Sequence, residues 1–130
     1  MVDYHQPFSG ISVTDVAEAT VFYTDKLGLT VVDVGGGMAG IDIGDGHRVL
    51  VYPKGAAHQP ASFTVLNLPV ADVTAAVREL TGRGVAFVHY DGMPQDDDGV
   101  MKGNGPDIAW LTDPSGNVFS VIVADEDSGS

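Results

Sequence analysis

The sequence contains no cysteine. A disulfide framework, a thiolate nucleophile and a thiolate zinc site are therefore excluded. The opening residues also lack the basic segment followed by an apolar segment that is typical of a secretory signal. Disulfide-bonded proteins are rare in reducing compartments, and exported proteins usually carry a signal segment. Both absences therefore favour a cytoplasmic protein.

Positive charge and long apolar runs are scarce as well. Lysine and arginine together number 6 against 18 aspartates and glutamates, which gives a formal net charge of −12. Phosphate neutralisation requires clustered cations, so we predict no nucleic-acid partner. No stretch approaches the roughly 18 consecutive apolar residues of a membrane span, so we predict no membrane partner.

The 130 residues suffice for about one domain, and they contain an internal repeat. Residues 11–16 (ISVTDV) align with residues 68–73 (LPVADV), and alternating apolar positions before each aspartate predict a strand. An apolar helical stripe follows in both copies. Asp15 with Glu18 resembles a capping box, and Gly28 and Gly84 stand where helices end in the left-handed conformation.

Each predicted helix precedes further strands. Apolar runs span residues 29–34 and 85–90, and glycine-containing turns lead into final strands within residues 44–52 and 113–123. The pattern predicts an α+β fold with the unit β-α-β-β-β occurring twice. Residues 53–61 form a linker, residues 91–106 form a long Gly-, Asp- and Pro-rich loop, and residues 125–130 are expected to be a flexible tail.

Two stretches resemble a known family. Residues 12–28 (SVTDVAEATVFYTDKLG) and 113–117 (DPSGN) are similar to the hallmark stretches of the vicinal oxygen chelate superfamily, the glyoxalase, bleomycin-resistance and extradiol-dioxygenase group. The resemblance covers about residues 8–124. It implies a single domain, residues 1–124, made of two tandem βαβββ modules (about 8–52 and 62–124). Their curved mixed sheets would form a cup-shaped cavity for a small molecule, and members commonly form homodimers.

The metal enzymes of that superfamily carry ligands seven residues before the aspartate of each helix and four residues after the glycine of each final turn. These positions hold Phe8, Leu50, Val65 and Ser120 here. Three hydrocarbon side chains and one neutral hydroxyl are poor donors for a divalent cation. We therefore predict no metal at the common site and no cofactor. An alternative site using His47, His58 or His89 stays open.

Three other motifs have weaker support. Residues 35–40 (GGGMAG) match a dinucleotide-binding pattern, but strand-like alternation follows where a helix is required, which favours a hairpin. Residues 96–99 (DDDG) lack the spacing of a calcium loop, which favours a solvated acidic loop. No G-x-S-x-G motif supports a catalytic triad.

Strand alternation predicts which side chains line the cup. The face that carries Phe8, Leu50, Val65 and Ser120 should also carry Gly10, Ser12, Arg48, Tyr52, Phe63, Asn67, Val118 and Ile122. Trp110 could reach the mouth of the cup, and Met101, Met93 and Val100 could fold down from a mobile loop. The predicted ligand-binding residues are Phe8, Ser12, Arg48, Leu50, Tyr52, Phe63, Val65, Asn67, Met101, Trp110 and Ser120.

Several of these residues have a second interpretation. Phe8, Leu50, Phe63 and Val65 could simply fill the core. Arg48 could pair with an anionic ligand or lie on the exposed surface. His58 and Lys54 fall on the linker, where a solvated position is favoured.

Two functions are compatible with the sequence. The first is a metal-independent protein that sequesters or carries a small, largely apolar molecule. The second is an enzyme of the same fold, with an atypical metal or none, that uses Tyr52, Arg48 or a histidine as acid, base or electrostatic stabiliser. Convergent ionisable groups are few on the predicted face, which favours binding.

Overall fold

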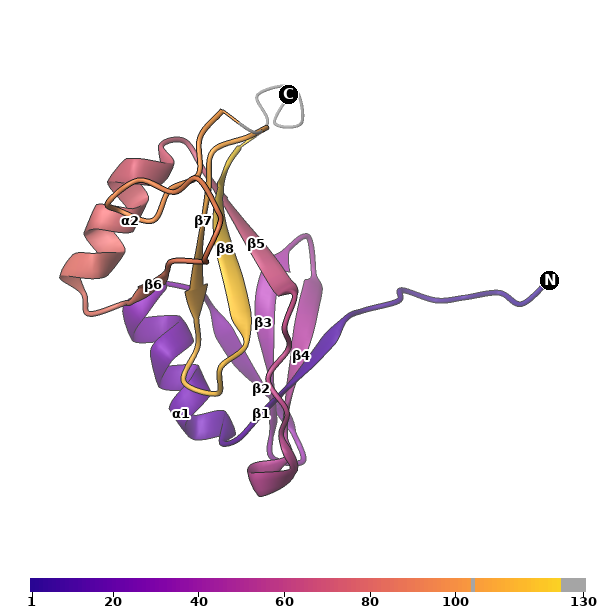
Figure 1. Cartoon of the computed structure of the whole chain (residues 1–130). Helices are drawn as coiled ribbons and strands as arrows, with labels where there is room; N and C mark the ends of the chain where they lie inside the picture. Colours follow the sequence, from indigo (N-terminus) through magenta and orange to yellow (C-terminus); the bar gives the residue numbers. More distant parts are fainter. Residues whose placement is uncertain (104, 125–130) are drawn as a thin grey trace. The chain divides into compact units, whose positions relative to one another are not determined.

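The structure is a computed structural model that describes residues 1–103 and 105–124 (Figure 1). The predicted flexible tail, residues 125–130, lies outside the described residues. The chain divides into two compact units, Met1–Pro60 and a second that begins at Ala61. The boundary falls inside the predicted linker.

The first module contains β1 (Gly10–Val13), α1 (Val16–Val21), the π-helical turn η1 (Phe22–Lys26), β2 (Val31–Gly35), β3 (Met38–Gly44) and β4 (His47–Pro53). Its strands form one mixed sheet in the order β1-β4-β3-β2. β1 and β4 are parallel, whereas the β3–β4 and β2–β3 pairs are antiparallel. The 3-10 turn η2 (Gly55–Ala57) follows β4.

The second module repeats this arrangement. It contains β5 (Thr64–Val70), α2 (Val73–Gly82), β6 (Phe87–Val88), β7 (Ile108–Thr112) and β8 (Val118–Val123), in the sheet order β5-β8-β7-β6. β5 and β8 are parallel, and the other pairs are antiparallel. The predicted α+β fold with two βαβββ modules is confirmed. The strand predicted over residues 85–90 is shorter, because its pairing with β7 covers Phe87 and Val88 alone.

Both helices begin where the sequence predicts. The carboxylate of Asp15 accepts a hydrogen bond from the backbone N–H of Glu18 at 3.0 Å, and Asp72 accepts one from Ala75 at 3.0 Å. These bonds satisfy N–H groups that the first helical turn leaves without a partner. Gly28 and Gly84 have positive φ angles of 72° and 93°, as predicted for residues that end a helix.

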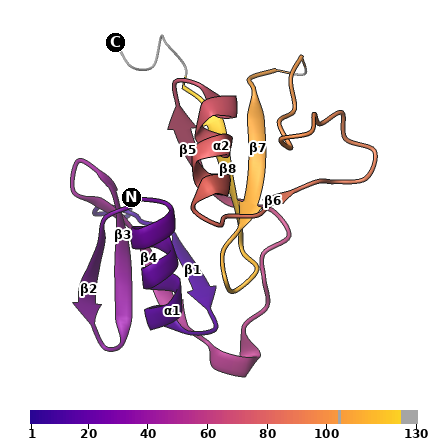
Figure 2. The ribbon, with the colours of Figure 1, turned by 90° about the vertical axis from the view of Figure 1, so that its left-hand side faces the viewer.

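Each helix covers one face of its own sheet (Figure 2). In the first module Ala19 and Tyr23 are fully buried together with the β-strand residues Val13, Ile41 and Val51. In the second module the helical residues Val73, Val77 and Leu80 are buried, as are the strand residues Ala109, Leu111, Phe119 and Val121. Removing these apolar side chains from water stabilises each module. Within residues 1–103 and 105–124, neither module places a helix of its own on the opposite face of its sheet, which we call the helix-free face.

The DPSGN stretch is a hydrogen-bonded turn between β7 and β8. Oδ1 of the buried Asp113 accepts hydrogen bonds from the backbone N–H groups of Ser115 at 2.9 Å and Asn117 at 2.8 Å. Oδ1 of Asn117 in turn accepts from the N–H of Ala61 at 3.2 Å. The hallmark motif therefore fixes the hairpin and holds the chain just before β5. Its role in this structure is architectural.

The loop between β6 and β7 is held in place by internal hydrogen bonds. The amide of Gln95 donates to the carbonyls of Val88 (2.9 Å) and Gly99 (2.8 Å) and accepts from the N–H of Tyr90 (2.7 Å). Met101 forms isolated bridges with Gln95 and Ile108. The glycine and proline content predicts a loop without regular structure, and the described loop residues indeed contain only turns, bends and isolated bridges. Gln95 holds this irregular backbone by supplying hydrogen-bond partners for it.

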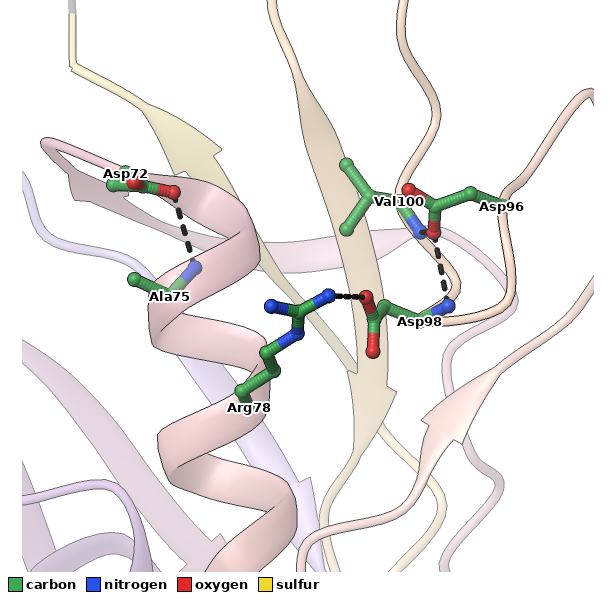
Figure 3. Close-up of polar contacts among 6 residues, drawn as sticks. All are labelled: Asp72, Ala75, Arg78, Asp96, Asp98 and Val100. Atoms are coloured by element: carbon green, nitrogen blue, oxygen red, sulfur yellow. Dashed lines mark hydrogen bonds and ion pairs between the residues drawn. The ribbon is translucent and has the colours of Figure 1, made fainter.

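The acidic part of this loop is attached to α2 (Figure 3). Arg78 forms an ion pair with Asp98 at 3.1 Å, and Oδ1 of Asp96 accepts from the N–H groups of Asp98 and Val100. Val100 is 1% exposed. The expectation that Val100 folds onto a ligand is therefore wrong, because this side chain is already part of the core.

Candidate functional site

The helix-free face of the first sheet carries the predicted site residues of that module. Gly10 pairs with Leu50 and Ser12 pairs with Tyr52, so these four residues share a face. Arg48 lies on the same face, two residues from Leu50 along β4. The neighbouring residues Val49 and Val51 point the other way and are buried. Strand alternation thus placed Ser12, Arg48, Leu50 and Tyr52 correctly on one face.

A hollow of about 240 Å³ lies on this face. Its lining combines the segment before β1 with β3, β4 and the end of β2: Gln6, Pro7, Phe8, Val34, Gly40, Gly46, His47, Arg48 and Leu50. Phe8 is 71% exposed, so it is not a core residue. The walls are mainly apolar, and the guanidinium of Arg48 is the fixed positive charge among the lining residues.

Ser12 contacts a histidine that the sequence did not place in the site. Ser12 Oγ lies 2.8 Å from Nδ1 of His58, which follows η2 in the linker. His58 is half-buried. The prediction of a solvated His58 is wrong, because the chain after β4 turns back and brings the imidazole to β1. A contact across 46 residues has no signature in local sequence.

On the second sheet, a bulge changes the predicted alternation. Thr64 pairs with Val118 and Leu66 pairs with Phe119, so Val65 is an extra residue between them. Beyond the bulge, Asn67 of β5 pairs with Ser120 of β8, and Ser120 pairs in turn with Trp110 of the next strand, β7. The helix-free face of the second sheet therefore carries Asn67, Trp110, Val118 and Ser120. Thr64 also lies on this face, where simple alternation would have placed Val65.

A second hollow, of about 350 Å³, lies on this face. It is lined by Ser62, Phe63, Thr64, Tyr90, Met93, Trp110 and Val118. Tyr90 and Trp110 are in edge-to-face contact, with ring centroids 5.5 Å apart and planes at 76°. Phe63 is 69% exposed beside them. Three aromatic rings and a methionine thus surround one concave surface.

The other predicted residues of the second module do not line this hollow. Ser120 is fully buried, and its hydroxyl is hydrogen-bonded to Oδ1 of Asn67 at 2.5 Å. Met101 is half-buried beside Ile108, to which it is joined by two backbone hydrogen bonds. From the same loop, Met93 lines the hollow instead.

The donor chemistry of the four former ligand positions does not fit a divalent cation. Phe8, Leu50 and Val65 offer no lone pair, and the hydroxyl of Ser120 is engaged with Asn67. Within residues 1–103 and 105–124, no three His, Asp or Glu side chains come together as a group that could hold a metal ion. A metal-centred mechanism therefore has no supporting ligand set in the described part of the chain.

A third hollow, of about 560 Å³, lies on the helix side of the first sheet. It is lined by α1 and the β2–β3 hairpin: Val16, Ala17, Thr20, Val31, Val32, Asp33, Gly37, Met38 and Ala39. The carboxylate of Asp33 already accepts the N–H of Gly35 at 2.8 Å. With no aromatic ring in its lining, this hollow is a weaker candidate than the other two.

Solved structures with the same fold include proteins of different kinds. TnmS3, an antibiotic binding protein from Streptomyces sp. CB03234, is 23% identical, with 96% of this chain and 99% of that chain covered and a TM-score of 0.66. The oxidase ChaP-H2 is 16% identical over 99% of this chain and 100% of that chain, with a TM-score of 0.65. Virulence protein STM3117 from Salmonella typhimurium is 17% identical, with 96% of this chain and 100% of that chain covered and a TM-score of 0.64.

At these identities the similarity establishes the fold, and the fold alone does not determine activity. Curated protein sequences gave no significant match. No helix within residues 1–103 and 105–124 is long and apolar enough to span a membrane. The model of the Glyoxalase/Bleomycin resistance protein/Dioxygenase superfamily matches residues 6–121. Together with the paired βαβββ modules, this match over most of the chain shows that the protein belongs to that superfamily.

Proposed function

We propose that this protein binds small, planar, largely apolar molecules on the helix-free faces of its sheets, each face by itself, and sequesters or carries them without a metal. The observation that carries the proposal is the aromatic hollow of the second module. Phe63, Tyr90 and Trp110 surround it, and Phe63 leaves 69% of its surface in water. Burying such a side chain contributes about 1.5–3 kcal/mol, which a bound ligand would recover.

The chemistry of the hollow fits a flat ring system. Aromatic side chains prefer offset or edge-to-face contacts with other rings, and Tyr90 and Trp110 already adopt one. Met93 adapts to irregular shapes and completes the apolar lining. The hydroxyl groups of Ser62, Thr64 and Tyr90 are the polar groups that would orient the ligand. Binding of an antibiotic by TnmS3, which has the same fold, supports a binding role for this chain too.

The site and its setting support sequestration better than catalysis. The residues lining the second hollow include no carboxylate, imidazole or cation, and the phenol of Tyr90 is the single ionisable group among them, whereas catalytic sites usually gather several ionisable groups. The lack of cysteine is compatible with a cytoplasmic protein that captures its ligand after entry. We further propose that the functional form is a homodimer, which native mass spectrometry of the purified protein would detect together with any retained ligand.

The sole tryptophan provides a direct test. In a ¹H–¹⁵N spectrum, the indole N–H of Trp110 gives one isolated signal, and titration with 2-naphthamide should shift it. Phe63→Ala should weaken naphthamide binding by about tenfold, as expected for the loss of a large aromatic contact. Because Phe63 is exposed, the same variant should lose less than about 1 kcal/mol of folding stability.

A matched variant controls for indirect effects. Phe87 lies in β6 opposite Leu111 on the buried side of the sheet. Phe87→Ala should lower the unfolding temperature while leaving the naphthamide affinity of the folded protein unchanged. If Phe63→Ala instead destabilised the protein and left affinity intact, Phe63 would be a structural residue and the proposed site would be wrong.

One observation favours a second candidate function, a metal-independent enzyme. The contact between Ser12 Oγ and Nδ1 of His58 places a hydroxyl beside a potential general base on the helix-free face of the first sheet. Turnover of a bound ligand, followed by mass spectrometry and abolished in His58→Gln, would establish this function. Recovery of the ligand unchanged after prolonged incubation would leave binding as the function.

A further inference from the structure

We infer that the first hollow recognises an acidic oxygen group, such as a carboxylate, on an otherwise apolar ligand, and that Arg48 is the recognising residue. This inference rests on the proposed function, because it assumes that the helix-free faces bind small molecules. It specifies the chemistry recognised by the first module, and its lining residues are separate from those of the aromatic hollow in the second.

The guanidinium of Arg48 is available to a ligand. Among residues 1–103 and 105–124, Arg48 takes part in no hydrogen bond or ion pair, whereas Arg78 and Arg83 are paired with Asp98 and Glu79. The residue directly across the sheet is Asp42, which pairs with Arg48 in the β3–β4 register. Its Oδ1 accepts the N–H of Gly44 at 2.8 Å instead. The charge of Arg48 is therefore left for an external partner.

The backbone makes room for Arg48 to lie along the sheet. A Cβ atom added at Gly40 would lie 3.0 Å from Cδ and 3.5 Å from Cβ of Arg48, and 3.4 Å from Cγ1 of Val34. Gly40 is buried in the middle of β3, where glycine usually weakens a strand. Here it allows the arginine stem to cross the strand closely, which directs the side chain along the wall of the hollow.

The rest of the lining complements an anion with an apolar body. The chain carries 18 acidic residues, yet none of the nine residues that line the first hollow is acidic. Phe8, Val34 and Leu50 offer apolar surface next to Arg48. A guanidinium binds a carboxylate through two parallel N–H···O bonds, which an ammonium cannot reproduce. The expected ligand is thus a flat apolar molecule with a carboxylate or comparable acidic group at one end.

Two probes with the same rings but different charge test this inference. At neutral pH, 2-naphthoate carries a carboxylate, whereas 2-naphthamide has the same rings and no charge. Isothermal titration calorimetry should show that the native protein binds naphthoate about tenfold more tightly than naphthamide, despite its formal net charge of −12. Added salt should weaken the binding of naphthoate and leave that of naphthamide nearly unchanged.

Variants assign the preference to Arg48. Arg48→Met should remove the preference for naphthoate, and Arg48→Lys should retain part of it because the charge remains without the planar fork. Gly40→Ala should reduce the preference by displacing the arginine stem. Lys102→Met removes one positive charge from the loop after β6 and serves as the control, so it should keep the full preference.

The outcomes separate this inference from the proposed function. Equal affinity for both probes in the native protein would overturn the anion site while leaving small-molecule binding intact. A preference that persists in Arg48→Met would overturn the role of Arg48. Failure of both probes to bind would overturn the proposed function together with this inference.

Discussion

The hydroxyl of Ser12 in β1 lies 2.8 Å from Nδ1 of His58, although 46 positions separate the two residues in sequence. This contact joins the first strand of the module to the segment that leaves it. Lys54 adds a backbone bond to the same strand, since its N–H donates to the carbonyl of Val13 at 2.9 Å. The linker is therefore attached to the sheet at both ends of η2.

Ser12→Ala should loosen this attachment. We expect a loss of about 1 kcal/mol of folding stability, because a half-buried side-chain hydrogen bond contributes roughly that amount. Hydrogen exchange at backbone amides 55–58 should become faster. Ser62→Ala, at an exposed serine of the second module, is the control and should change stability by less than about 0.5 kcal/mol. Unchanged exchange in Ser12→Ala would show that the contact does not hold the linker.

Asp113→Ala should be among the more destabilising single substitutions. Asp113 is 4% exposed, and its loss would leave the N–H groups of Ser115 and Asn117 without their acceptor. We expect a cost of about 3 kcal/mol in urea denaturation. Asp72→Ala removes a carboxylate from an exposed helix cap and should cost about 1 kcal/mol. Equal costs would contradict the structural role of the DPSGN turn.

Gln95→Ala should release the loop between β6 and β7. The side chain makes three hydrogen bonds to backbone groups, and their loss should cost about 2 kcal/mol and accelerate hydrogen exchange at the amide of Tyr90. Arg78→Met removes an ion pair whose side chains are 71% and 30% exposed, so its effect on stability should stay below about 1 kcal/mol. The reverse ranking would show that the ion pair, and not Gln95, holds the loop.

Purified protein should contain well below one divalent metal ion per chain. Phe8, Leu50 and Val65 supply no donor atom, and Ser120 is bonded to Asn67. Elemental analysis after desalting measures the metal content, and treatment with a chelator should leave naphthamide binding unchanged. A tightly held stoichiometric metal would mean that other side chains form a site.

Much of the fold was determined by local sequence. Asp15, Asp72, Gly28 and Gly84 set the helix boundaries because capping and left-handed glycines depend on a few neighbouring residues. The repeat of this pattern, with β-branched runs after each helix, predicted two βαβββ modules. Alternation then placed Arg48 and Tyr52 on the same face as Ser12, since the side-chain period of a strand is two residues.

The remaining features were decided by tertiary structure. The bulge at Val65 depends on how β5 pairs with β8, and it brings Thr64 to the face that alternation assigned to Val65. The ordered loop depends on Gln95 finding carbonyls on both sides of the turn. His58 reaches Ser12 through the path of the chain after β4. Such contacts form between residues that local patterns treat independently, so only the folded backbone determines which polar groups meet.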